Sequence, residues 1–239
     1  AGVLDPIDQT EAYLAAAKDH PDCARIYARL TAARARSEAV AAHDRAKQER
    51  RHSLLDGVAI SWKDNIDSGG TVTEAGSKLL EGRVPRKDGN ILARAARRGT
   101  VCLGKTHMTE LAFSGLGLNP VTATPPNALD PDLAPGGSSS GAAVSVALGL
   151  AAAAIGTDTG GSVRVPAAWN GLVGFKPTHG ALPEKGIVPL ARKFDIPGPI
   201  ARTVEDCAEL FAIMADQPAP DLQDASVRGL RLMVLEGLP

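Results

Sequence analysis

One of the most apolar stretches of the chain has a glycine-rich turn at each end. Residues 142–155 carry no charge and consist mainly of alanine and other small apolar residues, with a glycine-rich turn on either side. A segment that is apolar all round packs inside a protein. We therefore expect the turn at residues 136–141 to open a buried helix. The turn at residues 156–162 follows a short apolar run.

Upstream, the spacing of apolar positions first predicts helices and then a strand. Helix formers fill residues 8–17, with Thr10 as the expected N-cap. Residues 22–51 have helical spacing throughout, so we expect one long helical segment there. Its apolar positions are Ile26, Leu30, Ala33 and Val40. Residues 58–62 then predict a strand, and Lys63 stands at its end.

A second alternation of helix and strand follows. Residues 90–98 predict a helix that Gly99 terminates, and residues 100–103 predict a short strand. We expect a helical turn at residues 109–113, whereas five prolines make residues 119–135 irregular. This alternation indicates an α/β architecture with a partly parallel sheet.

Composition and charge exclude several classes of protein. The chain has 239 residues, 44% hydrophobic and 22% charged, which is typical of a soluble globular protein with one large or two modest domains. A net charge of −1 provides no general attraction to nucleic acid or to an anionic membrane. Residues 142–155 are too short and too weakly apolar to span a bilayer. Three widely spaced cysteines argue against a disulfide framework or a cysteine zinc site, and favour a reducing, cytoplasmic location.

The two glycine-rich turns carry the candidate chemistry, because each presents serine. Glycine allows backbone N–H groups to approach a ligand closely, and consecutive N–H groups can form an anion-binding nest. A hydroxyl beside such a nest supplies a nucleophile and an oxyanion hole, which acyl transfer requires. Simple Gly/Ser linkers are the alternative, but linkers lie in polar sequence, and these turns border an apolar segment.

Two motif matches compete with this interpretation. Residues 99–106 fit the phosphate-binding pattern G-x4-G-K-[ST], but the four intervening residues are the expected strand, so no phosphate cradle can form. Residues 137–141 fit G-x-S-x-G, with Ser139 at the centre. A nucleophile elbow must follow a strand, and the proline-containing residues 130–135 cannot be a central strand. A Ser139–His179 hydrolase therefore stays open as a disfavoured alternative.

Several blocks in this order resemble the amidase signature family. The central blocks are Gly-Gly-Ser-Ser-Ser-Gly at residues 136–141 and Thr-Asp-Thr-Gly-Gly-Ser-Val-Arg-Val-Pro-Ala at residues 157–167. The other matching blocks are residues 56–64, 104–106, 109–110, 171–178, 194–195 and 198–206. The match extends from about Asp5 to Asp216, and so many separate blocks make it highly specific.

The resemblance implies a Ser-Ser-Lys triad on a mixed β-sheet core covered by α-helices. Ser162 corresponds to the family nucleophile, Ser138 to the bridging serine, which follows a cis peptide bond in the family, and Lys63 to the base. The implied oxyanion hole consists of the backbone N–H groups of Thr159, Gly160, Gly161 and Ser162. Neither a metal nor a cofactor is implied. A lysine base must be neutral near pH 7, so its pKa must fall from about 10.4 by several units through burial.

The chain departs from the family pattern in one residue and in length. His179 stands where the family more often has tyrosine, which bears on local packing. The family's catalytic domain is roughly twice as long. We therefore expect residues 1–51 to be an N-terminal helical segment packed on the core, and residues 52–239 to be the N-terminal half of that domain. A further strand begins near Arg231, and Ala1-Gly2 starts in mid-pattern, so we expect a fragment that lacks some specificity determinants.

Three functions remain open at this point. The first is an amidase that hydrolyses a small-molecule carboxamide, as a monomer or a homodimer, without direct contact to nucleic acid or membrane. The second, also within the resemblance, is an amidotransferase component that releases ammonia from glutamine and passes it to a partner that modifies tRNA. The third is a non-catalytic scaffold on the same fold.

Overall fold

A six-stranded mixed sheet forms the centre of the molecule. The structure is a computed structural model that describes residues 4–231, so the strand expected after Arg231 and the start at Ala1-Gly2 lie outside the described residues. The strands are β1 (Tyr27–Leu30), β2 (Ala59–Lys63), β3 (Val101–Thr106), β4 (Ala153–Asp158), β5 (Val173–Gly174) and β6 (Ile196–Ala201), in the order β1-β3-β2-β4-β6-β5. The central strands β3, β2 and β4 are parallel, and the outer pairings are antiparallel.

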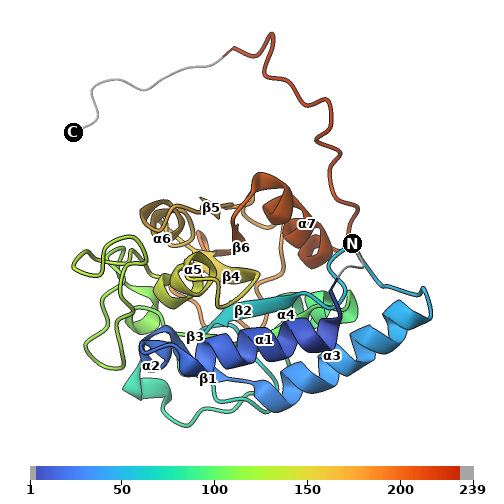
Figure 1. Cartoon of the computed structure of the whole chain (residues 1–239). Coiled ribbons are helices and arrows are strands. Elements are labelled where there is room, and N and C mark those ends of the chain that lie inside the picture. Colours follow the sequence, from blue (N-terminus) through green and yellow to red (C-terminus); the bar gives the residue numbers. More distant parts are fainter. Residues whose placement is uncertain (1–3, 232–239) are drawn as a thin grey trace.

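Helices cover both faces of this sheet (Figure 1). The α-helices are α1 (Pro6–Asp19), α2 (Cys23–Ile26), α3 (Ala32–Lys47), α4 (Asn90–Arg97), α5 (Ser140–Ala147), α6 (Arg164–Trp169) and α7 (Val204–Ala215), with short 3-10 turns η1 (Lys78–Leu80) and η2 (Glu110–Ala112). Figure 1 shows α1 and α3 side by side, with the sheet behind them. No helix within residues 4–231 combines the length and the apolar character that crossing a membrane requires.

Alternation along β2 divides its side chains between two cores. Ile60 and Trp62 belong to a cluster with α4 and α7, whereas Ala59 packs with α1, α3 and β3. Side chains alternate between the faces of a strand, so Lys63 lies on the same side of β2 as Ala59. The strand thus directs a buried lysine away from the larger apolar cluster.

Most of the expected elements are confirmed. The strand predicted at residues 58–62 is β2, the helix predicted at residues 90–98 is α4, and Gly99 follows it with φ +92°. The apolar segment after residue 141 contains a helix, α5, that is buried except at Ala147, and leads into β4. The fold class, a mixed α/β sheet covered by helices, is as predicted.

Two predictions for the N-terminal segment are wrong. The first helix begins at Pro6, and its N-cap is Asp5, whose carboxylate accepts a hydrogen bond from Ile7 N, because proline suits the first helical position. Thr10 lies buried inside this helix.

The long helix predicted over residues 22–51 is interrupted. Residues 27–30 form β1, an edge strand antiparallel to β3, and the helical spacing of Ile26 and Leu30 is coincidental. In α3 the buried face is made of alanines, Ala35, Ala39 and Ala42, while Val40 is exposed. Pairing with a sheet edge is a long-range interaction, and periodicity within one segment does not report it.

Candidate active site

The ends of β2 and β4 bring the two halves of the site together. These strands are parallel neighbours, with Trp62 opposite Ile155, so Lys63 at the end of β2 lies beside the last residues of β4. The carboxyl ends of adjacent parallel strands are where α/β proteins commonly place functional groups. Lys63 has no exposed surface.

Ser138 reaches the same point from the turn that precedes α5. The Gly137–Ser138 peptide bond is cis, as the resemblance implies, and Ser138 is fully buried. Glycine is required here because a Cβ on Gly137 would lie 2.6 Å from Gly117 N. Gly136 has φ +75°, a conformation that favours glycine.

Lys63 and Ser138 are in direct contact. Lys63 Nζ lies 2.7 Å from Ser138 Oγ, 2.8 Å from Thr157 Oγ1 and 3.2 Å from the Thr157 carbonyl oxygen. Burial lowers the pKa of Lys63 to about 7, against the opposing attraction of the carboxylates of Asp158 and Asp195. A large part of this amine is therefore neutral at pH 7, the form in which it can accept a proton.

Ser162 lies beside this pair, at the floor of an open cleft. Ser139 N donates to the Ser162 carbonyl at 3.2 Å, which joins the two serine turns. Ser162 is 9% exposed and lines a cleft of about 440 Å³ together with Gly137, Thr159 and Leu190. Within residues 4–231 no hydrogen bond joins its hydroxyl to that of Ser138. The structure thus brings Lys63 and Ser138 together and leaves Ser162 largely buried at the lining of the cleft.

Asp158 shapes the loop that carries Ser162. Its carboxylate accepts hydrogen bonds from Gly161 N at 2.8 Å and Val163 N at 3.0 Å, and it pairs with Arg164. The N–H of Gly161, one of the four expected oxyanion donors, is therefore already engaged. In the described chain the N–H groups of the other three, Thr159, Gly160 and Ser162, have no hydrogen-bond acceptor.

The competing motifs do not form sites. Residues 101–106 are β3, so the G-x4-G-K-[ST] match lies in a strand and provides no phosphate loop. Ser139 hydrogen-bonds the backbone of Thr157, while His179 contacts Arg192 and Glu184. The Ser139–His179 pair is absent from the described residues. Nor does any cluster of three or more potential metal ligands occur among them.

Sequence reasoning missed three residues around Lys63. The Thr157 hydroxyl also accepts a hydrogen bond from Asn65 Nδ2 at 3.0 Å, so Asn65 and Thr157 together fix the lysine amine. Asp195 lies near both Lys63 and Thr159. Thr157 and Asp195 belong to blocks that match the family, and Asn65 directly follows such a block, but their chemistry depends on strand neighbours that spacing alone does not reveal.

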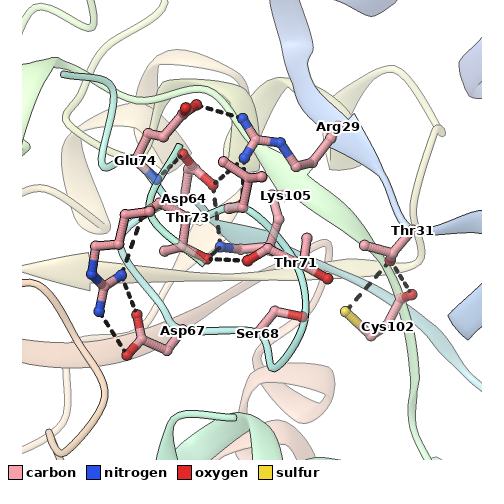
Figure 2. A network of polar contacts seen from close by, with 12 residues as sticks. Arg29, Thr31, Asp64, Asp67, Ser68, Thr71, Thr73, Glu74, Cys102 and Lys105 are labelled. Carbon is pink, nitrogen blue, oxygen red and sulfur yellow. Dashed lines mark hydrogen bonds and ion pairs between the residues drawn. The ribbon is translucent and has the colours of Figure 1, made fainter. Parts of the chain in front are cut away.

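A buried polar network fixes the chain just after Lys63 (Figure 2). Asp64 accepts hydrogen bonds from Lys105 Nζ at 3.2 Å and from Glu74 N at 3.0 Å, and Arg29 Nη1 lies 4.0 Å away. Lys105 has no exposed surface and also donates to Thr73 Oγ1 at 3.1 Å. The end of β2 is thus anchored by an ion pair that is separate from the Lys63–Ser138 contact.

Replacing Lys105 with methionine is expected to destabilise the fold strongly. The apolar side chain fills a similar volume but removes the nearest cation from the buried Asp64 carboxylate, and breaking a buried pair in this way costs about 3–5 kcal/mol. Urea denaturation measures the free energy of unfolding. The matched control is Arg98→Met, which removes an exposed ion pair with Asp216 and should cost much less, because solvent screens such a pair. Equal losses in the two variants would contradict the structural role of Lys105.

Comparisons with known proteins identify the family of this chain. A family model described as Amidase matches residues 8–231. The chain is 40% identical over 202 residues to a glutamyl-tRNA(Gln) amidotransferase subunit of Syntrophobacter fumaroxidans, covering 79% of this chain and 42% of that protein. It is 35% identical over 229 residues to a mitochondrial glutamyl-tRNA(Gln) amidotransferase subunit of Anopheles gambiae, covering 93% of this chain and 46% of that protein.

Solved structures give the same result. The native peptide amidase from Stenotrophomonas maltophilia superposes with a TM-score of 0.83 at 34% identity, covering 93% of this chain and 49% of that one. The chain therefore spans a little under half the length of the relatives that it matches. Because the family model extends over nearly all of its residues and amidase structures share its fold, the chain belongs to the amidase signature family.

Proposed function

We propose that the protein hydrolyses a carboxamide C–N bond through an acyl-enzyme on Ser162. The observation that carries this proposal is the 2.7 Å contact between Lys63 Nζ and Ser138 Oγ, in a fully buried setting that lowers the pKa of Lys63 to about 7. A serine hydroxyl needs a base, and a neutral lysine can serve as one.

In the first step protons pass along the three residues. Lys63 accepts the proton of Ser138, and Ser138 accepts that of Ser162, whose oxygen attacks the carbonyl carbon of the amide. Ser162 must rotate its hydroxyl toward Ser138, because the two do not hydrogen-bond in the described chain. The free N–H groups of Thr159, Gly160 and Ser162 are the proposed donors to the oxyanion that forms.

The second half of the reaction reverses this transfer. Lys63 returns its proton through Ser138 to the departing nitrogen, so ammonia or an amine leaves and the acyl group stays on Ser162 as an ester. Water then loses a proton along the same path and attacks the ester. The carboxylate leaves, and Ser162 regains its proton.

Two measurements test this proposal. Incubation with simple carboxamides should release ammonia and carboxylate in equal amounts, and a serine-directed phosphonate should label Ser162, as peptide mass spectrometry would show. Absence of both would instead favour a non-catalytic scaffold.

The names of the relatives support a second candidate, a component of an amidotransferase. Two of them are glutamyl-tRNA(Gln) amidotransferase subunits, and that name indicates a role within an assembly. In that case glutamine is the amide, and partner proteins receive the ammonia. Ammonia release from glutamine that rises only when such a partner is added would favour this candidate over a free-standing amidase.

Exhaustive chelation is expected to leave the activity unchanged. Acyl transfer through Ser162 uses a serine hydroxyl, a lysine amine and backbone N–H groups, and none of these steps requires a metal ion. Rates before and after dialysis against EDTA and phenanthroline check this expectation. A loss of activity that one added metal restores would count against the proposed mechanism.

A further inference from the structure

We propose that Asp195 is a positioning residue for amide hydrolysis, whose carboxylate holds the loop of residues 159–162 against the segment of residues 188–191 beside the cleft. This inference rests on the proposed roles of Ser162 and Lys63. Asp195 does not line the cleft itself, so it acts through the groups that it holds.

The hydrogen bonds of Asp195 join the two segments directly. Its Oδ1 accepts from the Thr159 hydroxyl at 2.5 Å and from Ala191 N at 3.0 Å. Its Oδ2 accepts from Leu190 N and Ala191 N, both at 2.9 Å. Thr159 and Leu190 both line the cleft with Ser162. One carboxylate therefore determines the spacing between the proposed oxyanion loop and a wall of the cleft.

Both carboxylate oxygens are needed for this link. An amide at position 195 keeps the shape but turns one oxygen into an NH₂ group, which cannot accept a hydrogen bond from an N–H. If the NH₂ group faces the backbone, the Leu190 and Ala191 N–H groups lose their acceptor at Oδ2. If it faces Thr159, the hydroxyl must accept where it had donated, and the bond loses the strengthening that the carboxylate charge gives. Hydrogen bonds to charged groups are the stronger ones, so the loss should be large enough to displace the loop.

Asp195 also differs from the other carboxylate near Lys63. Asp158 is paired with Arg164, whereas no cation in the described chain lies within ion-pair distance of Asp195. Glu184 and Arg192 line the same small cavity without pairing with it. Asp195 is 6% exposed, so solvent screens its charge poorly. Both carboxylates raise the pKa of Lys63, and Asp158 does so more than Asp195.

The charge of Asp195 changes the pKa of Lys63 in a known direction. The carboxylates of Asp158, on β4, and Asp195, just before β6, raise the pKa of Lys63, in opposition to the lowering caused by burial. Removing the charge of Asp195 favours the neutral amine and lowers the pKa of Lys63. The pH at which activity rises must then move toward acid.

The test is the pH profile of kcat and KM for Asp195→Asn. We expect kcat on the alkaline plateau to fall about ten- to hundredfold, the range expected for a lost hydrogen bond to a charged group, with a smaller change in KM. The rising limb of kcat/KM should shift to lower pH. A carboxylate that only stabilised the fold would lower the plateau without this shift, and that result, or an unchanged plateau, would overturn the proposal.

A second variant keeps the proposal testable if Asp195→Asn does not fold. Thr159→Val removes the hydroxyl donor and keeps the branched shape and the charge of Asp195. We expect kcat to fall about tenfold, while the rising limb of kcat/KM stays at the same pH as in the parent protein. An unchanged kcat would overturn the proposed link. The matched control is Asp216→Asn, an exposed carboxylate paired with Arg98, which should leave kcat and the limb unchanged.

Failure of this inference is distinguishable from failure of the proposed function. If the parent protein is labelled on Ser162 and Ser162→Ala is inactive, the acyl-enzyme mechanism stands whatever the Asp195 variants do. If labelling of Ser162 is absent, the proposed function fails first.

Discussion

Replacing Ser162 with alanine is expected to abolish amide hydrolysis and covalent labelling together. The proposed acyl-enzyme forms on this hydroxyl. Two serines of the described chain line the cleft, Ser114 and Ser162, and only Ser162 directly follows Gly160-Gly161 and hydrogen-bonds through its carbonyl to Ser139 N, next to Ser138. Removal of the nucleophile of a serine hydrolase costs on the order of a millionfold in kcat. Steady-state ammonia release and mass spectrometry after phosphonate treatment measure the two effects.

Two other serine variants make this result specific. Ser37→Ala, at an exposed position on α3, should leave activity and labelling intact. Ser139→Ala should lower activity much less than Ser162→Ala, because Ser139 is buried and bonded to the Thr157 backbone. Labelling on Ser139 that depends on His179 would contradict the proposed mechanism.

Replacing Lys63 with arginine is expected to remove most of the activity at every pH. The parent should show kcat/KM rising with pH through the pKa of Lys63, about 7, because burial favours the neutral amine, which is the form that accepts a proton. Arginine stays protonated at any usable pH, so it keeps the positive charge but cannot act as a base. A general base contributes about 10²–10⁴-fold, and we expect a loss of this size together with loss of the rising limb.

The comparison with Lys63→Ala separates a base from an electrostatic anchor. An anchor would tolerate arginine better than alanine, whereas a base should lose activity in both variants. The matched control is Lys18→Arg, at an exposed position in the last turn of α1, which should leave kcat/KM and its pH dependence unchanged. Near-normal activity of Lys63→Arg from pH 6 to 10 would show that Lys63 is not the base.

Short-range patterns in the sequence were sufficient to predict the secondary-structure elements that carry the candidate site residues. Lys63 could be placed at a strand end because it follows a mainly apolar run, residues 58–62, in a segment bounded by Gly57 and Asp64. The prediction of one long helix over residues 22–51 was wrong for a physical reason. Ile26 and Leu30 have helical spacing, but residues 27–30 pair with the edge of β3, which lies about 75 residues away along the chain.

The family motifs pointed to Lys63, Ser138 and Ser162 as site residues, and their roles stay a prediction. The structure brings the first two into contact. The engagement of Gly161 N by Asp158 was not foreseen. Neither was the bridge from Asp195 to Thr159. Both depend on the path of loops whose ends are fixed by β4 and β6, and motif spacing contains no information on that path.

The burial of Lys63 behind Ser138 also bears on side reactions. A neutral amine is itself a good nucleophile, and capture of an acyl group by Nζ would form an amide in place of the labile ester. Ser138 Oγ occupies the position 2.7 Å from this amine, and the amine has no exposed surface. In the proposed mechanism Ser138 therefore transfers protons to and from Lys63 and also shields the amine of Lys63 from acyl groups. The same burial should protect Lys63 from amine-directed electrophiles in solution, such as anhydrides and isocyanates.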